Sequence, residues 1–409
     1  MKILIVDVYG AIHSTGKITT LQYRYMKQRG HDVRVCYRGV REPKIDNPDY
    51  IPVAGCIEPG LGRLAAWITG YEGYVHPLAT RRLIRFTRDF HPDIVQLNIL
   101  HGYYINSNQY LAFLKEHDYR VSYSMFDEYA YMGKCPFSFD CDQFKTGCTG
   151  VCPEKKSYPR SFFFDRSEFL FEAKKAIYQG FKHIVFSGTS WVVDRARTSA
   201  LLKDKHLEVV DEPINYEEIF YPRDTQALRK KLGIPTNYKI IVTVAVLSDS
   251  RKGGVYFYQT AQKLVSEPNT TFVYVGCDAP EPVSLPNVIS IPFVSSQDEL
   301  AEYYSLADLF VNTTLADTTP CTCLEALGCG TPLAGFAAAG MPYVAPEAFS
   351  RLVPTYDIDA LARLVQEAPK KTAELSAACI DYARSKYSRD RIFGQLEQIY
   401  QSLVEEKFR

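Results

Sequence analysis

Residues 307–342 read ADLFVNTTLADTTPCTCLEALGCGTPLAGFAAAGMP, and their pattern changes from strand to loop to helix and back to strand. The apolar run at 308–314 is typical of a buried strand that ends in a loop. Thr319 fits the N-cap of the helix that follows, and Pro320 fits its first position. The segment therefore predicts a strand–loop–helix unit of an α/β domain, with a helix over Cys321–Cys329 that starts at the carboxyl edge of a parallel sheet.

Strand-like apolar runs alternate with helical patterns along nearly the whole chain. The expected strands are KILIVDV, DVRVCY, DIVQLNIL, RVSYSMF, HIVFSG and LEVVDEP in the first half, and KIIVTVAVL, TTFVYVG, VISIPFV, DLFVNTT and PLAGF in the second. Their nearly continuous apolar character indicates parallel sheets covered on both faces. Two such series predict two Rossmann-like doubly wound domains facing each other, with ligands at the carboxyl ends of the strands.

The chain has 409 residues, more than the roughly 250 at which single hydrophobic cores usually stop growing, so we expect two domains. The alternation is interrupted by prolines and short polar stretches at 209–222, which marks the boundary. We predict an N-terminal domain over 1–209 and a C-terminal domain over 210–387. The last segment, 388–409, has the spaced apolar residues of an amphipathic helix and is expected to pack back on the first domain.

Composition excludes several classes of protein. Lys and Arg total 47 and Asp and Glu total 47, so the zero net charge gives no support to a nucleic-acid partner. No run of about 18 apolar residues predicts a membrane-spanning helix, and the start MKILIVDVYG fits a buried strand better than a signal peptide. We therefore expect a cytoplasmic protein. Its 11 cysteines, an odd number in a long chain, are not the disulfide framework of a small secreted domain.

Two carboxylates, Asp317 and Glu325, are separated by seven residues across the loop and the helix start. The free amide groups and the dipole at the start of that helix attract an anion such as a pyrophosphate. Glu325 can accept two hydrogen bonds from a ribose diol, and Asp317 is placed to face a sugar, because charge-assisted hydrogen bonds suit sugar hydroxyls. The spacing alone fits an ordinary helix with an exposed glutamate equally well, but the surrounding strand–loop–helix–Cys-Gly-Thr-Pro–strand pattern favours a binding site.

In these features the segment resembles the donor-binding segment of retaining glycosyltransferases of family 4, also called glycosyltransferase group 1. Those proteins have two Rossmann-like domains that face each other across a cleft, the GT-B architecture, and typically show Glu-x7-Glu followed by Cys-Gly-Thr-Pro. Here Asp317 replaces the first glutamate, and Pro320 stands where many members have glycine. The resemblance implies a UDP- or GDP-sugar donor and no catalytic metal, with Asp317 and Glu325 at the catalytic centre. The donor would also be bound by residues of the helix start, namely Thr319, Cys321 and Thr322.

A second element on the donor side is SDSRKGG (248–254), which follows the strand KIIVTVAVL. The family places a lysine here and an arginine several residues earlier, and these cations stabilise the charge that develops on the departing diphosphate. Lys252 matches the lysine, whereas Val246 occupies the earlier position, so Arg251 is expected to substitute. Taken alone, the residues also fit a solvated basic turn. By the same resemblance, the backbone around Phe293 in the stretch IPFV would touch the nucleotide base.

The first half resembles polysaccharide-assembly members of the family, including the colanic-acid type, in its loop VYGAIHSTGKI and in NILHGYYIN. Gly16 in that loop permits close approach of the backbone to a ligand. His101, at a strand end, is a candidate catalytic residue, although a histidine held by structural hydrogen bonds fits equally. Relatives carry His-Asp where this chain has Phe126-Asp127, and a phenyl ring cannot hydrogen-bond a sugar hydroxyl. Either Asp127 or His101 takes over that role, or the donor differs, or activity is reduced.

Four cysteines fall within GKCPFSFDCDQFKTGCTGVCPEKK, with the spacing C-x5-C-x6-C-x3-C. In a cytosolic protein such a cluster is more typical of a tetrahedral zinc site than of two disulfides, and four thiolates leave no open position for catalysis. We predict a structural zinc site in an insert over about 133–160 of the first domain, although four reduced thiols also fit. The predicted ligands are Cys135, Cys141, Cys148 and Cys152.

The segment LATRRLIRFTRDF (78–90) places three arginines on one helical face and Leu83, Phe86 and Phe90 towards another. Acceptors in polysaccharide assembly are usually lipid-linked, so this helix is a candidate for peripheral contact with the inner face of a membrane. A solvated surface helix fits the same pattern.

Together, these features predict an enzyme that moves a sugar, with retention, from a nucleotide sugar to a growing, lipid-linked, cell-surface glycan. In this scheme the departing phosphate oxygen accepts the proton of the acceptor. The alternative is a catalytically weak scaffold of the same fold, which binds a glycan or partner glycosyltransferases through the cysteine-rich insert.

Overall fold

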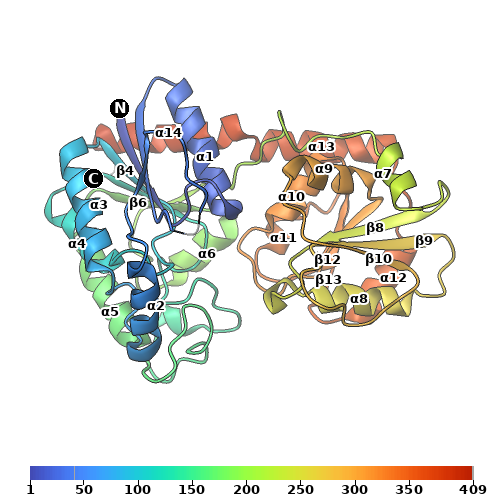
Figure 1. The fold of residues 1–409 in the computed structure, drawn as a ribbon, viewed down its shortest axis with the longest axis horizontal. Helices are drawn as coiled ribbons and strands as arrows, with labels where there is room; N and C mark the ends of the chain where they lie inside the picture. Colours follow the sequence, from blue (N-terminus) through green and yellow to red (C-terminus); the bar gives the residue numbers. More distant parts are fainter. Residues whose placement is uncertain (41, 408–409) are drawn as a thin grey trace. The chain divides into compact units, whose positions relative to one another are not determined.

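The protein forms two compact units in a computed structural model that describes residues 1–40 and 42–407 (Figure 1). The first unit comprises Met1–Glu212 and Ile392–Arg409, and the second comprises Pro213–Arg391. Each unit has its own parallel sheet and its own buried core. In the part of the chain that the structure describes, no helix is both long and apolar enough to cross a bilayer.

The first unit is built on a seven-stranded parallel sheet in the order β3-β2-β1-β4-β5-β6-β7. Its strands are β1 Lys2–Asp7, β2 Asp32–Tyr37, β3 Tyr50–Pro52, β4 Ile94–Leu97, β5 Val121–Met125, β6 Ile184–Gly188 and β7 Leu207–Val209. Its helices are α1 His13–Gln28, α2 Glu58–Thr69, α3 Pro77–Phe90, α4 Ser107–Glu116, α5 Ser167–Tyr178, α6 Ser190–Thr198 and α14 Arg389–Val404. The strand order reverses between β1 and β4, and sheets of this kind bind ligands beyond the carboxyl ends of such strands.

The second unit has a six-stranded parallel sheet in the order β10-β9-β8-β11-β12-β13. Its strands are β8 Lys239–Val244, β9 Thr270–Val275, β10 Val288–Ile291, β11 Leu309–Asn312, β12 Leu333–Phe336 and β13 Ser350–Val353. Its helices are α7 Gln226–Lys231, α8 Gly254–Lys263, α9 Gln297–Leu306, α10 Cys321–Gly328, α11 Met341–Val344, α12 Ile358–Glu367 and α13 Ala373–Tyr387. Here the order reverses between β8 and β11.

Continuous apolar sequences explain both sheets. Every residue of β4, β5 and β11 is buried, as expected for strands covered by helices on both faces. The prediction of two Rossmann-like α/β domains is confirmed, and all eleven predicted runs contain a strand. The structure adds β3 and β13, which are short strands at the sheet edges.

The loop predicted around Gly16 is in part a helix. α1 begins at His13, so Gly16 lies in the first turns of this helix, and the prediction that it is a loop residue is wrong. A Cβ at Gly16 would lie 3.0 Å from the Cβ of Tyr9 and 3.1 Å from the backbone nitrogen of Ala11. The missing side chain therefore allows the loop after β1 to fold closely over the start of α1.

The start of α10 also differs from the prediction. Pro320 is the N-cap residue and not the first helical residue, because its ψ of 87° is not helical. Thr319 consequently lies one position before the cap. The helix ends at Gly328, with Cys329 as its C-cap, one residue earlier than predicted.

Helix α14 lies against the first sheet. Its residues Phe393, Leu396 and Tyr400 belong to the same buried cluster as Ile3 and Ile5 of β1. The Tyr400 hydroxyl donates a hydrogen bond to a side-chain oxygen of β4 at 2.8 Å. Helix α14 thereby completes the core of the first unit, in which the chain begins.

Candidate active site

Two loops of the second unit bring the predicted cations next to a predicted carboxylate. The turn η2 (Ser250–Lys252) follows β8, and a second loop follows β11, which pairs with β8 in the sheet. The Nζ of Lys252 forms an ion pair with the carboxylate of Asp317. Beside it, Arg251 donates a hydrogen bond from Nη1 to the carbonyl of Ala316 at 3.0 Å. Arg251, Lys252 and Asp317 therefore gather at the carboxyl ends of adjacent strands.

Backbone contacts hold these two loops together. The amide of Leu315 donates to the carbonyl of Arg251 at 2.9 Å, and the hydroxyl of Thr313 donates to the carbonyl of Gly253 at 2.9 Å. Gly253 has a φ of 67°, and a Cβ there would lie 2.0 Å from the carbonyl oxygen of Thr313. A side chain at this position would force the loops apart, so glycine is needed to set the position of the two cations.

The start of α10 follows the Asp317 loop. Among the described residues, no side chain caps this helix by a hydrogen bond, and the buried hydroxyl of Thr319 has no hydrogen-bond partner. The next predicted binding residues, Cys321 and Thr322, are the first two residues of the helix and are half-buried. The start of α10 has amide groups to satisfy, and it follows the loop whose residues contact Arg251 and Lys252, so it suits an anionic ligand group.

Glu325 projects from α10 and is fixed by a tyrosine. The hydroxyl of Tyr304, on α9, donates to Oε2 of Glu325 at 2.6 Å. Burial, and then the charge of Glu325, raises the pKa of Tyr304 well above its usual range, so the tyrosine remains a hydrogen-bond donor. Phe293, in contrast, follows the edge strand β10, which β9 separates from β8, and its side chain is 63% exposed.

In the first unit, the structure brings His101 and Asp127 together. They follow β4 and β5, which are neighbours in the sheet, and Nε2 of His101 lies 2.6 Å from Oδ2 of Asp127. Because a carboxylate only accepts, this contact places a proton on Nε2. Nδ1 of His101 lies 3.0 Å from the hydroxyl of Tyr158, and the amide of Tyr129 donates to Oδ1 of Asp127 at 2.9 Å. Both members of the pair are thus held in fixed orientations.

Two further residues of this region were not predicted. Tyr158 comes from the cysteine-rich insert, and Glu72 comes from the loop after α2. Glu72 is buried, and its carboxylate accepts hydrogen bonds from the amides of Gly102 and Tyr103, next to His101. Burial raises the pKa of Glu72, and the nearby His101 opposes the increase. The positions of both residues depend on loop paths, for which the sequence contains no periodic signal.

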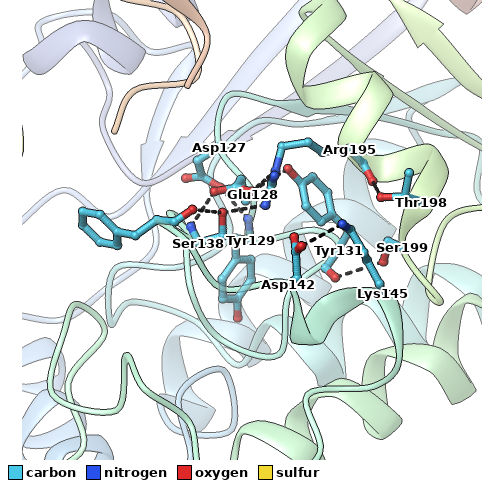
Figure 2. Close-up of polar contacts among 11 residues, drawn as sticks. Asp127, Glu128, Tyr129, Tyr131, Ser138, Asp142, Lys145, Arg195, Thr198 and Ser199 are labelled. Carbon is cyan, nitrogen blue, oxygen red and sulfur yellow. Dashed lines mark hydrogen bonds and ion pairs between the residues drawn. The ribbon is translucent and has the colours of Figure 1, made fainter. Parts of the chain in front are cut away.

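A buried ion pair attaches the insert to the first unit, as Figure 2 shows. Glu128, whose side chain is 2% exposed, accepts a hydrogen bond from Nε of Arg195 at 2.8 Å. It also accepts from the hydroxyl of Tyr131 at 2.9 Å and from the amide of Ser138 at 2.5 Å. Arg195 belongs to α6 and Ser138 to the insert, so a single carboxylate joins three parts of the chain.

The described part of the structure does not gather the four cysteines of the insert into a metal-binding group. Among residues 1–40 and 42–407, no group of three or more His, Cys, Asp or Glu side chains is placed to hold a metal ion. The thiols of Cys135 and Cys152 are hydrogen-bonded to each other, and this contact, with burial, raises the pKa of Cys135. Cys148 is buried, whereas Cys141 is partly exposed. Zinc binding by all four thiols therefore remains a prediction.

Comparison with known proteins gives a family for the second unit. Residues 224–386 match the family described as Glycosyl transferases group 1. The chain is 23% identical over 256 residues to the putative colanic acid biosynthesis glycosyl transferase WcaC of Escherichia coli K12, covering 60% of each protein. It is 26% identical over 135 residues to the N-acetyl-alpha-D-glucosaminyl L-malate synthase of Bacillus anthracis, covering 31% of this chain and 35% of that one. The chain thus spans less than two thirds of the length of these relatives.

Solved structures share the fold over the whole chain. Sucrose-phosphate synthase from Thermosynechococcus elongatus superposes with a TM-score of 0.69 at 17% identity, covering 99% of both chains. Alr3699/HepE of Anabaena, in complex with UDP-glucose, superposes with a TM-score of 0.64 at 14% identity, covering 98% of this chain and 100% of that one. These likenesses confirm the GT-B fold.

Proposed function

Because residues 224–386 belong to the glycosyl transferases group 1 family, we propose that the protein transfers a sugar from a nucleotide-diphosphate sugar to a growing glycan, with retention of configuration. The observation that carries the proposal is the group formed by Arg251, Lys252, Asp317 and the start of α10 at the carboxyl ends of β8 and β11. Two cations and a helix start are what a departing diphosphate requires.

Each donor-side residue has a separate task in this proposal. Lys252 and Arg251 neutralise the diphosphate, and the amides at the start of α10 bind its oxygens together with Thr319, Cys321 and Thr322. Glu325, oriented by Tyr304, accepts hydrogen bonds from the ribose. Asp317 binds the transferred sugar and at the same time orients Lys252. The backbone around Phe293 contacts the base.

We assign acceptor binding to the His101–Asp127 pair of the first unit. Phe126 packs against the apolar core of the first unit and offers no hydrogen bond to a sugar, so the polar groups nearest to it in sequence and space have to supply one. We assign that role to Asp127 and His101, which Tyr158 and Tyr129 hold in place. In a front-face reaction the departing phosphate oxygen takes the acceptor proton, and the pair positions the acceptor.

The finer identity of the substrates is also a proposal. A neighbour in fold binds UDP-glucose, which supports a UDP-sugar over a GDP-sugar. The name of the colanic acid relative supports a polysaccharide acceptor, which we take to be lipid-linked at the inner face of a membrane. A cytoplasmic enzyme in peripheral contact with that membrane fits both points. The four-thiol zinc site would have a purely structural part in this scheme.

A donor panel tests this function directly. Purified protein is mixed with UDP- and GDP-sugars, and both nucleoside diphosphate release and binding by calorimetry are measured. We expect one donor to bind and to be slowly hydrolysed, and Glu325→Ala to weaken its binding, whereas Glu281→Ala, an exposed carboxylate of the same unit, does not. If no donor binds and none releases a nucleoside diphosphate, the transferase function is wrong. The alternative is then the scaffold function, in which the same fold binds glycans or partner enzymes.

A further inference from the structure

Exposed apolar side chains concentrate on one helix of the first unit. Ile57, Leu61, Leu64 and Ile68 recur every three or four residues along α2, so they form one stripe, and each is between 43% and 73% exposed. An amphipathic helix normally turns such a stripe towards the core. The stripe of α2 faces outward instead.

The segment that directly follows the cysteine-rich insert extends this apolar stripe. Three consecutive phenylalanines, Phe162–Phe164, are between 46% and 68% exposed. The amide of Phe162 donates to the carbonyl of Trp67 in α2 at 2.8 Å, and the two rings lie 5.7 Å apart. The segment 162–164 therefore runs beside the carboxyl end of α2, in the lower part of the first unit in Figure 1. We call the stripe and the three phenylalanines together the α2–Phe surface.

Cations border the α2–Phe surface, while two carboxylates near it already accept hydrogen bonds from backbone amides. The guanidinium of Arg63 lies 5.2 Å from the ring of Trp67, and that of Arg166 lies 5.5 Å from the ring of Phe164. Glu58 accepts hydrogen bonds from two amides at the start of α3. Asp165 accepts from the amide of Cys152 in the insert and from that of Ser167 at the start of α5. Exposed apolar groups beside cations are typical of proteins that lie on anionic lipid.

The α2–Phe surface is connected to the acceptor-side pair through two tyrosines. Nε1 of Trp67 donates to the hydroxyl of Tyr103 at 3.3 Å, and the ring of Tyr103 lies 5.9 Å from that of Tyr158. Tyr158 in turn contacts His101. A substrate held by lipid at this surface would thus have its polar head close to His101 and Asp127, within the same unit.

The helix predicted to contact a membrane does not offer a comparable surface. Leu83 of α3 is buried, and Phe86 and Phe90 pack against the core of the first unit. The apolar residues of α3 are therefore not available for contact with a membrane, and contact through its arginines stays a prediction. The arginines Arg81 and Arg85 remain exposed on α3.

We propose that the α2–Phe surface docks the protein on the anionic leaflet of a lipid bilayer, where it presents a lipid-linked acceptor to His101 and Asp127. This inference rests on the proposed transferase function. A bilayer explains the surface better than a second copy of the chain, because in a two-fold dimer the cations that border the surface would meet a partner surface bordered by the same cations. An anionic leaflet complements them.

Vesicle co-sedimentation tests the surface separately from catalysis. Full-length protein is spun with vesicles of phosphatidylcholine mixed with phosphatidylglycerol, and with vesicles of phosphatidylcholine alone. We expect binding to the mixed vesicles that weakens with salt, and a loss of roughly tenfold or more in affinity for each of the double variants L61S/L64S and F163S/F164S. The control is Val265→Ser, which changes an exposed apolar residue of the second unit and should bind like the unaltered protein.

Several results would overturn the proposal. One is no vesicle binding by the unaltered protein, and another is equal binding by all variants. A dimer in analytical ultracentrifugation that both double variants dissociate would assign the surface to a second copy instead. Hydrolysis of the donor in water, measured in parallel, should be unchanged in the variants. If hydrolysis persists while vesicle binding fails, the transferase function stands and the docking surface is wrong.

Discussion

The His101–Asp127 pair of the first unit and the Lys252–Asp317 pair of the second differ in how firmly the surrounding protein holds them. Both side chains of the first pair are 11% exposed, and each has a further hydrogen bond to a tyrosine. In the second pair Lys252 is 29% exposed and lies on a turn. The first pair therefore has a fixed geometry, whereas Lys252 can exchange part of its contact with Asp317 for a contact with an anionic ligand.

The largest effect is expected where a fixed contact of the first unit is removed. Glu128→Ala leaves the guanidinium of Arg195 without its buried partner, so the free energy of unfolding should fall by about 3–5 kcal/mol. Urea denaturation measures this change. Asp142→Ala, which removes the exposed pair with Lys145 seen in Figure 2, should cost less than about 1 kcal/mol. Equal losses in the two variants would show that the first unit does not depend on the buried pair.

A second prediction concerns Asp7, which lies at the end of β1 and accepts a hydrogen bond from Thr19 at 2.6 Å. Burial raises the pKa of Asp7 to about 6. The folded state thus binds this proton more tightly than the unfolded state, and stability should fall as the pH rises from 4 to beyond 6, by up to about 3 kcal/mol. Asp7→Asn should flatten that part of the stability profile. The same slope in both proteins would mean that Asp7 titrates normally.

The Lys252–Asp317 pair of the second unit should behave in the opposite way to the buried pair: its loss should lower activity strongly and stability only slightly. Lys252→Ala is expected to lower sugar transfer about 100-fold, because one cation facing the departing diphosphate is lost. Its melting temperature should remain close to that of the unaltered protein, since the ion pair is partly exposed. Lys263→Ala, which removes an exposed lysine of α8, is the control. A strong loss of stability in Lys252→Ala would make the pair structural.

The smallest expected effect is that of Asp127→Asn. The substitution keeps the shape but removes the charge that orients His101, so the kcat/KM for the acceptor should fall roughly tenfold, about the value of one charge-assisted hydrogen bond. Hydrolysis of the donor in water should not change. Steady-state kinetics of sugar transfer and of donor hydrolysis measure the two effects separately. A parallel loss of hydrolysis would place Asp127 on the donor side.

Much of this architecture could be predicted because parallel sheets have a simple sequence pattern. The buried runs of β5, β8 and β11 are nearly continuous, so the carboxyl ends of the strands could be located, and with them Asp127, Lys252 and Asp317. The contacts between these side chains could not be predicted, because they depend on strand order and on the loop paths. For the same reason Glu72 could not be recognised from its sequence context as part of the region around His101.

The α2–Phe surface illustrates another limit. The spacing of Leu61 and Leu64 is the same in a helix that faces the core and in one that faces outward, so periodicity alone favours the core. Only the packing of α2 beside the segment 162–164 shows which face of the helix is covered. In α3, by contrast, Leu83 is buried, as its place on a face separate from the arginines indicates.

The return of α14 to the first sheet has a consequence for protein synthesis. On the ribosome, the strands of the first unit emerge before the second unit, but Phe393 and Tyr400, which complete the core around β1, emerge after it. The first unit cannot reach its final packing until translation has passed through the whole second unit. During that interval the part of the cluster around β1 that α14 covers is still exposed, and nascent-chain chaperones can bind there. The second unit is the first to be able to fold completely.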